Sequence, residues 1–195
     1  MADAPKLAAT AWQRALSLVV DKLAGLAWAL AGSAASSLQG LALEVHDLDI
    51  LADAKTAYRI AAQLEEFVTL PMAWRETEQF ISHFGRFFIE GTVVEVMGNL
   101  SIRGRGCIIS FHPSSLIWKN LKEVSFDGHP LRLVPLEAQL VANLIVEGKG
   151  ERARAIAAYL KGHGCDVELI RGLVIGQGLE SVLSEEIWGL LGETG

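Results

Sequence analysis

Hydrophobic positions change their spacing several times along the chain, and each change marks an expected element. Near the N-terminus apolar residues recur about every 3.6 positions, as on one face of a helix. Two later runs are short and almost fully apolar, as in buried strands. The expected elements of the first third are a helix at about 5–24, a strand at 26–31, a helix at 34–39, a strand at 43–50 and a helix from Asp53 to about Phe67.

Turn-forming residues divide the rest of the chain. Pro71 interrupts the pattern, and Gly91 and Asp127-Gly128 mark the turns of two expected β-hairpins. Between these hairpins we expect residues 99–110 to be irregular. The expected elements are strands at 79–90, 92–97, 122–126 and 131–134, then helices at 136–145, 151–160 and after Leu179. The last third of the chain is therefore expected to be helical.

Composition and charge narrow the classes of function. The 195 residues are 51% hydrophobic and 21% charged, which is typical of a globular chain that forms one compact unit. A formal net charge of −6 argues against a broad nucleic-acid-binding surface. Cys107 and Cys165 form neither a metal-type cluster nor a disulfide framework, which favours a reducing cytoplasm. The N-terminus lacks the basic region of a signal peptide, so we expect neither export nor membrane contact.

Two aspartates stand within the second apolar run. Side chains alternate along a strand, so Asp47 and Asp49 are expected on one face and His46 and Leu48 on the other. Adjacent carboxylates among apolar residues repel each other unless a divalent cation binds between them. The alternative is a strand end that opens to solvent. The pattern of this run leaves both interpretations open.

Two further features gain meaning beside these aspartates. Gly32-Ser33 lies between a strand and a helix, where free backbone N–H groups can bind a phosphate, although a plain turn is the commoner use. Glu95 is enclosed by apolar residues, so it points either outward at a sheet edge or inward toward a cation. A third carboxylate on a strand beside the two aspartates would complete an acidic metal site.

In this order and spacing the residues resemble a known family. Ala31-Gly32-Ser33, a gap of thirteen residues and Asp47-Leu48-Asp49-Ile50 are similar to the motif of the nucleotidyltransferase fold. DNA polymerase β, tRNA nucleotidyltransferases and antibiotic nucleotidyltransferases share this fold. The family's third carboxylate comes from a later strand, where Glu95 stands, so the resemblance covers about residues 5–100. Residues 135–140 look like the following helix of small bacterial, toxin-like members.

The resemblance implies an α+β fold with a mixed β-sheet flanked by helices. Residues 1–134 would form the nucleotidyltransferase core, and residues 135–195 a C-terminal helical subregion packed on it as part of one compact unit. The implied reaction transfers a nucleoside monophosphate from an NTP donor to a hydroxyl acceptor with Mg²⁺, as one or two bound ions.

The same resemblance assigns the site residues. The implied catalytic and metal-binding residues are Asp47, Asp49 and Glu95, and the implied phosphate-binding residues are Gly32 and Ser33. Further candidates for neutralising the triphosphate are Lys55, Arg75 and Arg86.

The acceptor and the partners stay open at this point. The hydroxyl acceptor can be a small molecule, an RNA end or a protein, and a homodimer or an antitoxin partner is a further expectation. The alternative function is a catalytically weak binding module of the same fold, or a component of a toxin–antitoxin pair.

Overall fold

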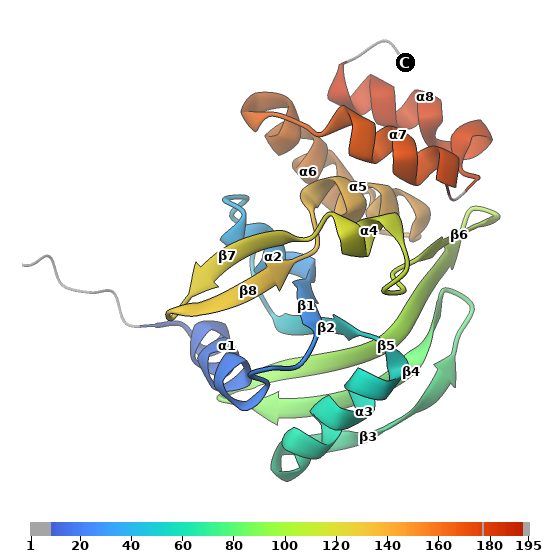
Figure 1. Cartoon of the computed structure of the whole chain (residues 1–195). Helices are drawn as coiled ribbons and strands as arrows, with labels where there is room; N and C mark the ends of the chain where they lie inside the picture. Colours follow the sequence, from blue (N-terminus) through green and yellow to red (C-terminus); the bar gives the residue numbers. More distant parts are fainter. Residues whose placement is uncertain (1–8, 177, 193–195) are drawn as a thin grey trace, which may run out of the picture.

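A single mixed β-sheet runs through the middle of the chain. The computed structural model describes residues 9–176 and 178–192 (Figure 1). The strands are β1 (Trp28–Ala31), β2 (Asp47–Ala52), β3 (Val68–Glu76), β4 (Phe80–Ile89), β5 (Thr92–Gly104), β6 (Cys107–Ser110), β7 (Lys122–Phe126) and β8 (His129–Leu133). Their order is β3-β4-β5-β2-β1-β8-β7, and β6 pairs with the end of β5. The pairs β2–β5 and β1–β8 are parallel and the others antiparallel, which confirms the expected mixed sheet.

Helices cover this sheet on both faces. They are α1 (Ala11–Lys22), α2 (Gly32–Leu38), α3 (Ala54–Gln63), a 3-10 turn (Glu65–Phe67), α4 (Leu116–Lys119), α5 (Leu136–Ile145), α6 (Gly150–His163), α7 (Val167–Gly176) and α8 (Glu180–Leu191). Figure 1 shows α5 to α8 gathered at one end of the molecule, with α1 and α3 at the other. The α+β class is confirmed. A division at residue 134 stays a prediction, and residues 193–195 lie outside the described part.

The alternation of side chains in β2 and β5 separates two hydrophobic clusters. Leu48 and Ile50 pack with Val94 and Val96 in a cluster that also contains side chains of α1, α2 and α3. Leu51, two residues after Asp49, belongs instead to the cluster that contains α5 to α8. The face of the sheet that carries the aspartates is therefore the face covered by the C-terminal helices.

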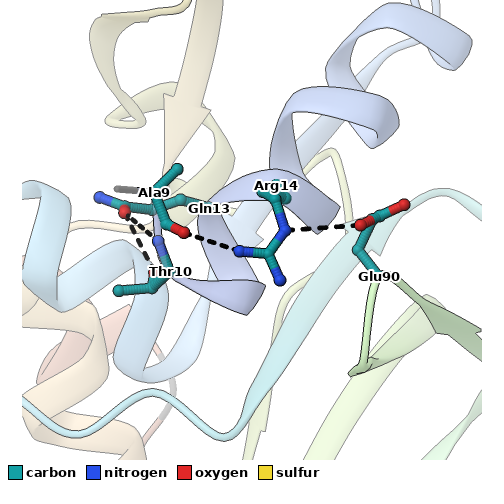
Figure 2. Close-up of polar contacts among 5 residues, drawn as sticks. All are labelled: Ala9, Thr10, Gln13, Arg14 and Glu90. Carbon is teal, nitrogen blue, oxygen red and sulfur yellow. Dashed lines mark hydrogen bonds and ion pairs between the residues drawn. The ribbon is translucent and has the colours of Figure 1, made fainter. Parts of the chain in front are cut away.

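The N-terminal helix is capped and tied to the turn between β4 and β5. The Thr10 backbone N–H donates to Oε1 of Gln13 at 2.9 Å (Figure 2). Arg14 donates to the carbonyl of Ala9 at 2.7 Å and forms an ion pair with Glu90 at 3.4 Å. The helix thus begins at Ala11, later than expected, because Thr10 is extended and serves as its N-cap.

Both expected hairpin turns are confirmed by backbone geometry. Glu90 and Gly91 have φ values of +50° and +79°, and Asp127 and Gly128 have +49° and +80°. Two successive residues with positive φ are typical of the tight turn that matches the twist of antiparallel strands.

The expectation that residues 99–110 are irregular was wrong. β5 continues to Gly104 and pairs with β6 through a tight turn at Arg105 and Gly106, whose φ values are also positive. The basic side chains of this segment are held by partners: Arg103 pairs with Glu76 and Arg105 with Glu186. Glycines near the turn hid the strand period from sequence reasoning.

β3 and α7 were not expected from the sequence. β3 contains Pro71, which lacks a backbone donor, and it lies at the edge of the sheet with register shifts between Val68 and Ala73. An edge strand tolerates proline because one side of its backbone needs no sheet partner. α6 also continues through Gly162 to His163 and is capped by Gly164 at φ +100°.

Within the described residues, each helix is too short or too polar to cross a lipid bilayer.

The contact between β5 and α5 gives a test of the fold. A Cβ atom on Gly104 would lie 2.1 Å from the backbone oxygen of Ile145. We therefore expect Gly104→Ala to lower the free energy of unfolding by about 1–3 kcal/mol, because backbone must shift to admit the methyl group. Chemical denaturation measures the change. Gly162→Ala is the matched control, since no atom lies within 4 Å of its added Cβ, and it should be neutral or slightly stabilising. Equal stability of Gly104→Ala and the parent chain would contradict this packing.

Candidate active site

The three predicted carboxylates lie on neighbouring strands of the sheet. β2 and β5 run parallel in a register that pairs Asp49 with Glu95, and Asp47 precedes Asp49 by two residues on the same face. One oxygen atom from each of Asp47, Asp49 and Glu95 lies within 4.8 Å of the others. The structure therefore brings together residues that are 48 positions apart in the sequence. Glu95 does not lie at a sheet edge, because β5 stands between β4 and β2, and all three carboxylates are partly buried.

The turn at Gly32 approaches one of these carboxylates closely. β1 is antiparallel to β2 and pairs Ala31 with Asp49, so Gly32 follows directly beside that aspartate. A Cβ atom on Gly32 would lie 2.0 Å from Oδ2 of Asp49, and the residue has φ +67°. Both the close approach and the positive φ require glycine here.

Ser33 differs in its placement from Gly32. Gly32 lines the cavity described below, whereas Ser33 is 2% exposed and does not contribute to the cavity wall. A hydroxyl group of α2 also connects this helix to α5. The Ser36 hydroxyl lies 3.0 Å from the Gly32 carbonyl and 3.2 Å from Oε1 of Gln139 on α5. The backbone of Gly32, rather than the Ser33 side chain, is thus the part of this turn that faces the cavity. A phosphate-binding role for either residue stays a prediction.

A cavity of about 590 Å³ lies between the acidic face of the sheet and the C-terminal helices. Its wall includes Asp47, Asp49 and Glu95 from the sheet, together with Asn143 from α5 and Arg152 from α6. The packing of α5 on β5 and of α6 on α5 builds this wall. The volume lies within the range of small-molecule sites.

The pKa of Asp49 responds to this arrangement of carboxylates. The pKa of Asp49 is raised from 3.8 to about 7. Burial is the largest cause, the charges of Asp47 and Glu95 act in the same direction, and Arg152 and Lys149 act in the opposite direction. A carboxyl group with such a pKa sits where an added cation would be strongly favoured.

Cations line the cavity in two places. Arg86, the cross-strand partner of Glu95, donates from Nε and from Nη2 to one Glu95 oxygen at 2.9 and 2.7 Å. Arg75 of β3 also lines the cavity, whereas Lys55 does not. Lys149 and Arg152, which line it near the start of α6, were missed. On a helix exposed along one side, such residues resemble ordinary surface cations, so sequence offered no signal for them.

His46 was expected to point away from the aspartates, on the opposite face of the strand. The structure corrects this: His46 precedes the first residue of β2, is exposed and lines the cavity, with Nε2 3.6 Å from a Glu44 oxygen. Strand alternation does not extend to a residue outside the strand.

Comparisons with known proteins agree with the geometry. The model of the aminoglycoside-2''-adenylyltransferase family matches residues 15–154, which is more than two thirds of the chain. The chain belongs to this family. The match spans the whole sheet, Gly32, all three carboxylates, Lys149 and Arg152. The nucleotidyltransferase resemblance of the motif is thereby confirmed.

Solved structures support the same assignment. A Thermotoga maritima protein assigned as a nucleotidyltransferase is 32% identical and has a TM-score of 0.62, over 78% of this chain and 94% of that one. The solution structure of the antibiotic-resistance factor ANT(2'')-Ia is 13% identical with a TM-score of 0.50, over 90% and 94% of the two chains, and shows a shared fold. No curated protein sequence matches the chain significantly.

The raised pKa of Asp49 predicts how the stability of this adenylyltransferase-family chain depends on pH when metal is removed by EDTA. Between pH 4 and 7 the folded state holds a proton on Asp49 that the unfolded state has lost, so Asp49 makes stability fall as pH rises through this interval. One pKa unit corresponds to about 1.4 kcal/mol. We expect Asp49→Asn to raise the free energy of unfolding by about 1–3 kcal/mol at pH 8 in the presence of EDTA, and by little at pH 4.

Urea denaturation at several pH values measures this difference. Glu185→Gln on α8 removes an exposed carboxylate and serves as the control, with no gain expected at either pH. A destabilised Asp49→Asn at pH 8 would contradict the electrostatic description of the site.

Proposed function

We propose that this chain transfers a nucleoside monophosphate from an NTP to a hydroxyl acceptor in a Mg²⁺-dependent reaction. The family makes adenylyl transfer, and therefore ATP, the first donor to test. The observation that carries the proposal is the set of three carboxylates, Asp47, Asp49 and Glu95, gathered within 4.8 Å on the wall of a cavity large enough for small molecules.

The donor set fits magnesium. Carboxylate oxygens are the ligands that this ion prefers, and a site that raises the pKa of Asp49 by burial and by like charges is one that a cation relieves. Asp47, Asp49 and Glu95 would hold the metal. When bound, Mg²⁺ would stabilise the negative charge that develops on the phosphoryl oxygens during transfer.

The residues of the chain itself divide the remaining work. The backbone at Gly32 lies beside Asp49 and would contact the donor phosphates. Lys149 and Arg152 act electrostatically on Asp49 from the opposite wall and would neutralise the triphosphate. Arg86 would hold the Glu95 side chain in place, since both of its bonds go to one Glu95 oxygen and leave the other oxygen free.

The alternative of a binding module with weak or absent catalysis is less well supported. A module that only binds a partner has no need to keep three carboxylates in mutual repulsion, and their removal would stabilise the fold. A toxin–antitoxin role, a homodimer and a cytoplasmic location stay predictions.

Removal of one metal-binding carboxylate tests the proposed function. We expect ATP with Mg²⁺ to raise the melting temperature of the parent chain, because a ligand of the folded state stabilises it. Asp47→Asn should lose the Mg²⁺-dependent part of this shift and should lose nucleotidyl transfer by at least 100-fold. Thermal denaturation and release of pyrophosphate measure the two effects. Asp21→Asn, at an exposed carboxylate on α1, should behave as the parent chain. If Asp47→Asn keeps the full Mg²⁺-dependent shift in melting temperature, the proposed metal site is wrong.

The α6 cations give a separate prediction. Arg152→Gln and Lys149→Gln should each weaken ATP binding about 10- to 100-fold, since a charge-assisted contact contributes about 1.5–3 kcal/mol. AMP binding should change less than ATP binding, because AMP lacks the outer phosphates. Calorimetric titration measures both constants, and Lys161→Gln, on the same helix but outside the cavity wall, is the control. Equal losses for AMP and ATP would show that these cations do not contact the outer phosphates.

A further inference from the structure

The end of the cavity away from Gly32 is lined mainly by apolar side chains, whereas the other end carries the three carboxylates. The apolar end is built by β4, β5 and the residues after β6. The apolar side chains at this end are Phe80, Phe84, Met97, Leu100, Ile102 and Phe111. Phe80 is 39% exposed, so the apolar wall reaches the mouth of the cavity. Such a wall favours contact with a carbon ring or chain over contact with a heavily hydrated molecule.

The geometry of transfer identifies this end with the acceptor. The attacking hydroxyl and the departing pyrophosphate lie in line on opposite sides of the α-phosphorus. In the proposed function Gly32, Lys149 and Arg152 contact the donor phosphates, so these three cavity-lining residues would mark the pyrophosphate side of the triad. Glu95 lies on β5, and β4 and β3 follow beyond it in the sheet. The acceptor therefore approaches from the side of β4 and β3.

Two arginines stand on that side. Arg86 of β4 is bonded to Glu95 and lies over the Phe84 ring, with Cζ 5.7 Å from the ring centre. Arg75 of β3 has no carboxylate within 4.0 Å among the described residues, and Nη2 donates to the Pro71 carbonyl at 3.2 Å. Its Nε is buried without a hydrogen-bond partner. A partly buried guanidinium without an anion is costly, so a ligand anion would be favoured there.

Carboxylates for a cationic acceptor are missing from this wall. Within the part of the chain that the structure describes, the acidic side chains that line the cavity are Asp47, Asp49 and Glu95 alone. These three would be engaged by metal in the proposed function. An acceptor with several ammonium groups, such as an aminoglycoside, would meet Arg75 and Arg86 with no free carboxylate to pair with, which is unfavourable for each buried charge.

We propose that the acceptor is a small hydroxyl compound with an apolar ring or chain and a carboxylate or phosphate group, and that Arg75 binds this anion. The inference rests on the proposed function and names its substrate class. In the reaction the acceptor hydroxyl oxygen forms a bond to the α-phosphorus and loses its proton, while the bond from that phosphorus to pyrophosphate breaks. The products are the nucleotidyl ester, pyrophosphate and the proton.

Binding of four probes to the full chain, measured by calorimetry or NMR titration with Mg²⁺ present and without nucleotide, tests this proposal, because the metal then occupies the three carboxylates of the cavity wall. The probes are hydroxymethylbenzoate, hydroxymethylphenyl phosphate, benzyl alcohol and kanamycin. We expect at least one of the two anionic probes to bind at least tenfold more tightly than benzyl alcohol, and kanamycin to bind no more tightly than benzyl alcohol, at physiological ionic strength. The two anionic probes tell a carboxylate preference from a phosphate preference.

Variants of Arg75 test whether this residue causes the preference for the anionic probes. Arg75→Gln should abolish the preference for the anionic probe, and Arg75→Lys should keep part of it, because the charge remains while the planar guanidinium is lost. Arg103→Gln, which removes an arginine of β5 that does not line the cavity, is the matched control and should keep the full preference. ATP binding by Arg75→Gln shows that this variant is folded.

The outcomes separate this inference from the function on which it rests. Equal or tighter binding of kanamycin, or an anion preference that survives Arg75→Gln, overturns the proposed acceptor class even if ATP and Mg²⁺ bind normally. If the parent chain does not bind ATP and Mg²⁺, the proposed function is overturned instead. The anion preference can be measured in that case too, because its assay contains no nucleotide. With ATP and Mg²⁺ present, mass spectrometry of the preferred anionic probe should show one added nucleotidyl group.

Discussion

The parallel register between β2 and β5 is the constraint on which the site depends. It places Asp49 directly beside Glu95, with Asp47 two residues away on the same face, so three like charges meet within 4.8 Å. This arrangement raises the pKa of Asp49 and costs stability in the absence of a cation. A one-residue slip would relieve the repulsion by turning one set of side chains to the other face. Leu48, Ile50, Val94 and Val96 prevent that slip, because they are fully buried on the opposite face and would lose their packing.

The hydrophobic core and the acidic site are therefore two sides of the same strands. α1, α2 and α3 pack against one face and hold the register, while α5 and α6 stand over the other face and leave a cavity. Gly32 belongs to both parts, because its missing side chain admits the Asp49 carboxylate and its backbone begins α2. The stability of one face thus supports the strained charges on the other, as is common where function opposes stability.

The cavity also has a division that the acidic residues alone do not suggest. Its cations near α6 face Asp49, whereas Arg75 and Arg86 lie beside an apolar wall on the far side of Glu95. Family membership supports nucleotidyl transfer, whereas in the acceptor class proposed above side chains of β3 and β4 would select the acceptor. A family named for cationic acceptors can therefore include a chain whose acceptor wall suits an anion.

Local spacing determined much of this protein. Strand alternation put Asp47 and Asp49 on one face, and Gly91 and Gly128 marked tight turns, because these features depend on neighbouring residues only. The family resemblance implied a third carboxylate on a later strand, where Glu95 stands among apolar residues. Only the tertiary structure decided that Ser33 is buried and that Lys149 and Arg152 line the cavity. It also decided that β3 forms an edge strand of the sheet although it contains Pro71. Those outcomes depend on how distant segments pack, and the sequence around each residue carries no record of that packing.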